Sequence, residues 1–170
     1  MGLKFRIHPL AAAIAEEQLQ KLDNILKGRR EMAKYMINSL KGLPGIELPE
    51  FDQNINPSWY AFIIKYKPDE LDGLPRERFF NALQAEGLSE IDIPGSTCPL
   101  NYHPLFQNPS KIFPNYKGKV KYQKGDFPNA EEFHSRLLKL PVWHNKKHLK
   151  TVDLYIKGIK KVINNYREIL

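Results

Sequence analysis

The most informative stretch of this chain is residues 2–23, GLKFRIHPLAAAIAEEQLQKLD. From His8 to Leu22 its apolar residues recur at helical spacing, mostly on one face. Pro9 suits the first helical turn, because the N–H that proline lacks has no partner there in any helix. The small side chains of residues 11–13 allow another backbone to approach closely. The stretch predicts a helix over residues 8–22 that faces another segment of polypeptide.

The rest of the chain alternates between helical and strand patterns. A second helix is expected over 23–41, capped by Asp23 and ended by Gly42, Pro44 and Gly45. Further helices are expected over 76–85, 129–137 and 147–166, strands over 46–48, 59–66, 91–93 and 139–142, and a long proline-rich loop over 94–126. These elements predict an α/β fold, in which helices pack on a short, mainly antiparallel sheet.

Composition narrows the class of protein. The chain has 170 residues, 42% of them hydrophobic, a net charge of +7 and one cysteine, Cys98. It holds no apolar run of the ~20 residues that cross a bilayer, and a single cysteine suits a reducing compartment. We expect a cytoplasmic protein without a membrane partner. The lysines, densest at 146–150, are expected on solvated helix faces; no DNA- or RNA-binding motif accompanies them, and nucleic acid remains a minor alternative.

Residues 2–23 resemble a signature of the DegT-type (DegT/StrS) aminotransferases, which aminate keto-sugars with pyridoxal 5'-phosphate (PLP). The family pattern runs roughly G-x-N-[YF]-R-[ML]-x-x-[LF]-x-A-A-[IV]-[GA]-x-x-Q-L-x-[KR]-[LI]-D, and the spacing agrees throughout. Two residue types differ: Lys4 replaces an asparagine, and Ile7 replaces methionine or leucine. Pro128, residues 130–131 and residues 138–141 also resemble the family's P-x-A-E…L-x-L-P stretch.

The resemblance implies a fold and a division of the chain. It implies the small C-terminal domain of a fold-type I aminotransferase, preceded by a long interdomain helix. Residues 1–22 would be the tail of the large domain with that helix, and residues 23–170 the small domain. In the family the Schiff-base lysine lies upstream of the G-x-N-[YF]-R block. We therefore expect no catalytic residue in this chain, and PLP in the intact enzyme but not on this chain alone.

The resemblance also assigns binding residues. Lys4 aligns with the asparagine that reaches the PLP phosphate of the neighbouring subunit, and Arg6 with the arginine that holds this turn near the active site. A homodimer is implied. The alternatives are an exposed terminal lysine for Lys4 and an ordinary interface ion pair for Arg6.

Substrate-binding candidates come from a second stretch. Residues 101–106, NYHPLF, resemble the loop that faces the amino donor and the keto-sugar, so Tyr102 and His103 are expected to bind substrate hydroxyls or phosphate. The alternative is a solvated loop with Phe106 in the core.

Two other pairs carry weaker signals. His144 and His148 are spaced to share a helix face, as metal ligands do, but no third ligand follows in sequence, and no metal is predicted. The spacing of Cys98 and His103 does not favour a nucleophilic pair over a small buried thiol.

The predicted function is that of the C-terminal domain of a PLP-dependent aminotransferase. The intact enzyme would transfer an amino group from glutamate or glutamine to a keto-sugar, either a sugar nucleotide or a cyclic polyol. Such an enzyme would serve cell-surface polysaccharide or secondary-metabolite synthesis, and this chain alone would be inactive. Its partner would be the missing large domain, in the same gene or as a separate chain. The alternative is a non-catalytic binding or regulatory module with the same fold.

Overall fold

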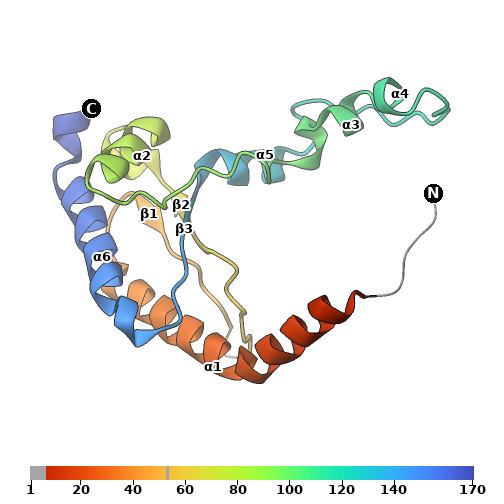
Figure 1. The fold of residues 1–170 in the computed structure, drawn as a ribbon. Coiled ribbons are helices and arrows are strands. Elements are labelled where there is room, and N and C mark those ends of the chain that lie inside the picture. Colours follow the sequence, from red (N-terminus) through yellow and green to blue (C-terminus); the bar gives the residue numbers. More distant parts are fainter. Residues whose placement is uncertain (1–6, 53) are drawn as a thin grey trace.

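A computed structural model describes residues 7–52 and 54–170 of the chain (Figure 1). Its helices are α1 (Pro9–Leu40), α2 (Arg76–Ala85), α3 (Pro104–Gln107), α4 (Pro109–Ile112), α5 (Pro128–Arg136) and α6 (Leu149–Asn164). Its strands are β1 (Ile46–Glu47), β2 (Phe62–Tyr66) and β3 (Leu137–Leu140). Within these residues, no helix combines the length and hydropathy that crossing a bilayer requires.

The sheet confirms the predicted α/β class. Its three strands are antiparallel in the order β1-β2-β3, with Ile46 opposite Tyr66 and Phe62 opposite Leu140. Alternate residues of β2 are buried, as expected of a strand with one face on a core. Helix α6 packs its apolar stripe against this core, and seven of its residues are buried: Val152, Tyr155, Ile156, Gly158, Ile159, Val162 and Ile163. The helix expected over 147–166 is thus confirmed as α6, and its apolar stripe is core packing.

Helix α1 differs from the two helices that the sequence predicts. It runs unbroken for 32 residues, and its N-terminus is capped by the His8 side chain, which accepts a hydrogen bond from the Leu10 N–H at 3.2 Å. The expected boundary at Asp23 was wrong, because neither glycine nor proline lies near it and a single aspartate costs an interior helix turn only some tenths of a kcal/mol. The end at Leu40 agrees with the prediction.

The strand predicted over 59–66 begins only at Phe62. Trp59 has a φ of 56°, in the left-handed region that interrupts an extended strand. Its carbonyl accepts a hydrogen bond from Arg29 Nη1 at 3.0 Å, and its ring stacks on Phe62 at a centroid distance of 5.6 Å. Tertiary contacts therefore override the strong strand propensity here, and the Trp59 side chain is buried in the core.

Residues 95–127 form a projecting segment, here called the arm. The sequence predicted an irregular loop, and the structure adds the short helices α3 and α4 to it. The two sides of the arm meet where the Tyr122 N–H donates to the Phe106 carbonyl at 3.0 Å. Figure 1 shows the arm and the N-terminal half of α1 projecting from the body toward the same side.

The segments flanking the arm differ slightly from expectation. The strand predicted over 91–93 is reduced to one bridge between Asp92 and Lys139, with hydrogen bonds of 2.9 and 2.8 Å in the two directions. The predicted helix over 129–137 is α5. Strand β3 starts at Leu137, two residues before the predicted position.

Candidate functional site

The predicted site residues lie partly within and partly outside the described part of the chain. Lys4 and Arg6 lie outside the described residues. Tyr102 and His103 lie at the base of the arm, where the 3₁₀ turn Leu100–Tyr102 leads into α3. Both side chains are half-buried.

A partly buried polar cluster surrounds Tyr102. Asn101 is 1% exposed, and its Nδ2 donates to Glu131 Oε1 at 2.7 Å and to the Gln123 carbonyl at 2.8 Å. The Tyr102 hydroxyl donates to Glu131 Oε2 at 3.0 Å. The Gly125 N–H also donates to this carboxylate, at 2.8 Å. One carboxylate therefore organises the base of the arm.

The electrostatics of this cluster follow from its hydrogen bonds. Partial burial opposes ionisation of Glu131, but hydrogen bonds from Gly125, Asn101 and Tyr102 outweigh it and lower the pKa of this carboxyl. Burial, and then the bond to Glu131, raise the pKa of the Tyr102 phenol. At neutral pH the pair is a carboxylate that accepts and a neutral phenol that donates.

His103 has a sulfur neighbour. Its Nε2 lies 3.5 Å from Cys98 Sγ, so the pair that the spacing left undecided is in contact. His134, on α5, turns its ring edge-on to Tyr102 at a centroid distance of 6.3 Å, and its Nε2 lies 2.7 Å from the Pro94 carbonyl. The base of the arm thus presents a phenol and two imidazoles, groups that bind hydroxyl-rich or charged ligands.

Sequence reasoning missed Asn101, Glu131 and His134 as members of this cluster. Two of them carried a signal, Asn101 as the first residue of the NYHPLF stretch and Glu131 as the last residue of the P-x-A-E resemblance. The contacts themselves link residues about 30 positions apart, which no local pattern predicts.

The described residues offer two kinds of group that could hold a metal or PLP, histidines and lysines. The rings of His144 and His148 are 6.5 Å apart at 82°, and within residues 7–52 and 54–170 no three potential metal ligands converge. Each lysine of the described residues is exposed or half-buried. A lysine that holds PLP covalently works in a desolvated pocket. None of the described lysines is buried in the way that such a pocket requires.

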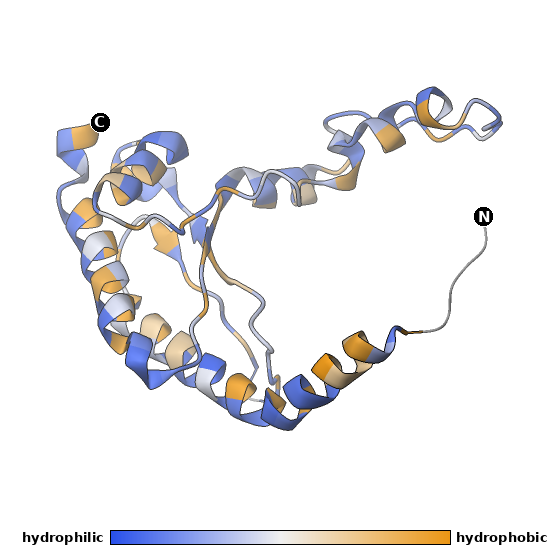
Figure 2. Cartoon of the chain, in the orientation of Figure 1, coloured by the Kyte–Doolittle hydropathy of each residue, from blue (hydrophilic) through white to orange (hydrophobic). Residues whose placement is uncertain are grey.

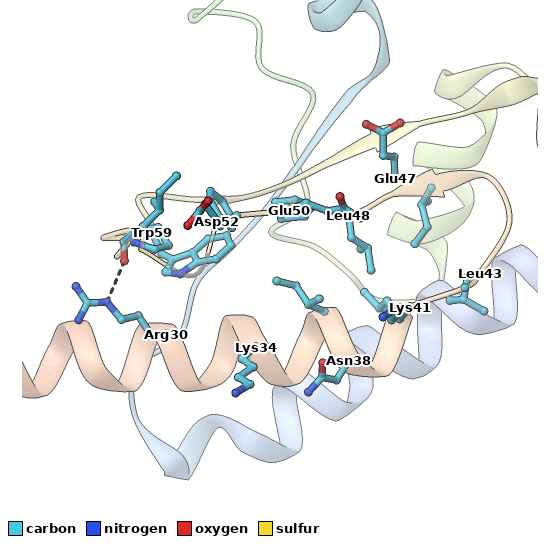
Figure 3. Close-up of a pocket in the computed structure, with 18 of the residues that line it drawn as sticks. Arg30, Lys34, Asn38, Lys41, Leu43, Glu47, Leu48, Glu50, Asp52 and Trp59 are labelled. Carbon is cyan, nitrogen blue, oxygen red and sulfur yellow. Dashed lines mark hydrogen bonds between the residues drawn. The ribbon is translucent and has the colours of Figure 1, made fainter.

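A cavity lies away from Tyr102 and His103. It measures about 1210 Å³ and runs between the C-terminal half of α1 and the segment that follows it (Figure 3). Lys34 and Lys41 line it from the helix, and Glu47, Glu50 and Asp52 from the opposite segment. We place the candidate site at the base of the arm, because half-buried polar side chains converge there on Glu131.

The N-terminal half of α1 carries an uncovered apolar face. On this face Leu10 is 70% and Ile14 63% exposed, and Leu19, on the opposite side of the helix, is 68% exposed. Figure 2 shows these apolar positions on the projecting part of the helix. An apolar face of this kind marks an interaction surface.

Comparison with known proteins identifies the family. The model of the DegT/DnrJ/EryC1/StrS aminotransferase family matches residues 1–154. The chain belongs to this family. The family assignment confirms the resemblance that residues 2–23 carry.

Relatives indicate the kind of chemistry found in the family. The spore coat polysaccharide biosynthesis protein SpsC of Bacillus subtilis is 25% identical over 95% of this chain and 38% of its own length. The dTDP-3-amino-3,4,6-trideoxy-alpha-D-glucose transaminase of Streptomyces venezuelae is 27% identical over 83% of this chain and 32% of its own length. A solved E. coli GDP-4-keto-6-deoxy-D-mannose-3-dehydratase with bound hydrated PLP matches at a TM-score of 0.67 and 21% identity, covering 93% of this chain and 36% of that one.

Each of these matches covers only part of the relative's length. The chain spans between about a third and two fifths of each relative, so it corresponds to part of a family member. Its relatives include sugar-modifying transaminases and dehydratases.

Proposed function

We propose that this chain is the C-terminal domain of a PLP-dependent aminotransferase that transfers an amino group from glutamate or glutamine to a keto-sugar. The observation that carries the proposal is the uncovered apolar face of α1 in a chain of this family. Leu10, Ile14 and Leu19 would face water unless another polypeptide covers them. The family's large domain, in the same gene or as a separate chain, supplies such a polypeptide. A homodimer in the cytoplasm completes the proposed assembly.

Different residues of this chain would contact the cofactor and the substrate. PLP, when bound, supplies an electron sink for bond changes at the carbon that carries nitrogen. We propose that Lys4 holds its phosphate, since an ammonium forms charge-assisted hydrogen bonds with phosphate oxygens, and that Arg6 fixes the surrounding turn. Tyr102 and His103 would bind the keto-sugar from the base of the arm.

The first experiment tests the chain alone. The purified chain is mixed with PLP, reduced with borohydride and digested, and labelled peptides are identified by mass spectrometry. We expect only weak, scattered labelling, because each described lysine is open to solvent. One lysine peptide labelled stoichiometrically would show that the chain has its own PLP site and would overturn the proposal.

The second experiment restores the missing part. The polypeptide encoded directly upstream of residue 1 is expressed with the chain, joined or separate, and assayed for PLP absorbance and amination of a keto-sugar. We expect Lys4→Ala to weaken PLP retention about ten- to hundred-fold, because a charge-assisted hydrogen bond is lost. His103→Ala should keep PLP and lower kcat/KM.

Two results would contradict this assignment. Normal PLP retention in Lys4→Ala together with PLP loss in His103→Ala would reverse the two roles. Partner binding without any PLP binding or turnover would favour the non-catalytic module.

A further inference from the structure

Glu131 joins the two ends of the arm. It lies in the first turn of α5, a position that favours negative charge. Its carboxylate accepts from Asn101 and Tyr102 where the arm begins, and from the Gly125 and Phe127 amides where it returns. The distances run from 2.7 Å for Asn101 to 3.3 Å for Phe127. No other side chain in the described residues receives as many hydrogen bonds.

We propose that Glu131 is a positioning residue of the substrate loop, which fixes Tyr102 with its hydroxyl proton engaged and its phenol oxygen free to accept. The inference rests on the proposed function, in which Tyr102 faces the keto-sugar. A phenol whose single proton is already donated to another group can only accept further hydrogen bonds. The partner of Tyr102 is then a hydrogen-bond donor, namely a sugar hydroxyl or an ammonium group. Phosphate and keto oxygens are excluded as partners, because two acceptors repel.

The orientation of Asn101 supports this role. Its Nδ2 faces two acceptors, the Gln123 carbonyl and the Glu131 carboxylate, so the opposite amide orientation would place an oxygen against both. In the observed orientation Asn101 Oδ1 is buried without a partner. A buried unpaired acceptor is costly, and its presence indicates that the donor side of Asn101 is what the site uses. The Asn101 amide group thereby holds the Glu131 carboxylate within hydrogen-bond reach of the Tyr102 hydroxyl.

The adjacent residue provides a matched control. Glu132 also lies on α5, but it is exposed, and its carboxylate pairs with Arg136 at 2.8 Å and with Lys65 at 3.4 Å. Glu131→Gln and Glu132→Gln each remove one negative charge from the same helix turn without changing side-chain volume. Only the first replaces an acceptor oxygen that faces converging donors with an amide.

The first test uses this chain alone and needs no activity. The titration of Tyr102 is followed by NMR with labelled tyrosine, and the Gly125 and Phe127 amides by hydrogen exchange. In Glu131→Gln we expect the Tyr102 pKa to fall toward its ordinary value and both amides to exchange about tenfold faster or more, because their acceptor is lost. In Glu132→Gln neither quantity should move. An unchanged Tyr102 titration in Glu131→Gln, or an equal shift in both variants, would overturn the proposal.

The second test uses the reconstituted enzyme. Glu131→Gln and Tyr102→Phe should each raise KM for the keto-sugar about tenfold, with kcat within about twofold of the parent. The double variant should be no worse than the worse single variant, because both changes remove the same interaction. Independent, multiplying effects would overturn the positioning role. If the parent enzyme shows no turnover, the proposed function fails, while the Tyr102 titration in the isolated chain still decides the role of Glu131.

Discussion

The two halves of α1 have the same backbone structure and opposite surroundings. In the C-terminal half, Met36 is 1% exposed and Leu40 fully buried, whereas in the N-terminal half Leu10 is 70% and Leu19 68% exposed. Both halves have apolar residues at helical spacing. The difference is that one half packs against α6 and contributes to the core, and nothing within the described residues covers the other. Apolar periodicity therefore predicts that a helix face will be buried, but it does not identify the polypeptide that buries it.

The boundary between the halves lies near Gly28. A side chain there would collide with the backbone carbonyl of His144, so the chain crosses the helix in direct contact with this glycine. From this crossing to its C-terminus, the helix packs against the rest of the chain. Substitutions in α1 test whether the helix is divided in this way.

The largest effect is expected from truncation in the covered half. Met36→Ala should lower the free energy of unfolding by about 2–5 kcal/mol, because it opens a cavity in a packed core. Leu19→Ala, a comparable truncation in the uncovered half, should stay within about 0.5 kcal/mol of the parent. Urea denaturation followed by circular dichroism measures both. Equal losses in the two variants would show that the chain itself covers both halves.

The next effect is expected at the crossing. Gly28→Ala should destabilise by about 1–3 kcal/mol, because the new methyl group overlaps a backbone atom that cannot move cheaply. In an open helix the same change would stabilise by roughly 1 kcal/mol. Lys27→Ala, at the exposed neighbouring position, is the control. A stabilising Gly28→Ala would mean that residues 141–148 do not contact the helix in solution.

A smaller effect concerns association. The isolated chain should self-associate through the uncovered face of α1, and Ile14→Lys should weaken this about tenfold, or roughly 1.4 kcal/mol, by burying a charge in an apolar contact. Glu16→Lys makes an even larger change toward positive charge, because it also removes a carboxylate, but at an exposed polar position it should have little influence. Sedimentation velocity across a concentration series measures both. A parent chain that stays monomeric at all concentrations would count against an uncovered interaction face.

The smallest effect is expected from the ion pair within the uncovered half. Glu17 and Lys21 pair at 3.5 Å across one helical turn, with both side chains largely exposed. Glu17→Gln should change the free energy of unfolding by less than about 0.5 kcal/mol, because exposed pairs of this spacing contribute little. A loss above 1 kcal/mol, measured by the same denaturation, would reveal a partner for Glu17 elsewhere in the folded chain.

The sequence by itself determined the elements that depend on near neighbours. The apolar stripe of α6, the span of α2 and the alternation in β2 follow from periods of a few residues, which sequence displays directly. The signature at residues 2–23 gave the family for the same reason, since its spacing lies within one segment.

Only the tertiary structure decided the features that join distant segments. The uninterrupted course of α1, the left-handed Trp59 held by Arg29, and the contacts of Glu131 with Asn101 and Tyr102 could not be predicted. Each depends on groups roughly thirty residues apart or on a balance between weak local preferences. Local preferences amount to tenths of a kcal/mol per residue, while one buried contact or unpaired polar group is worth one or more, so packing decides wherever the two disagree.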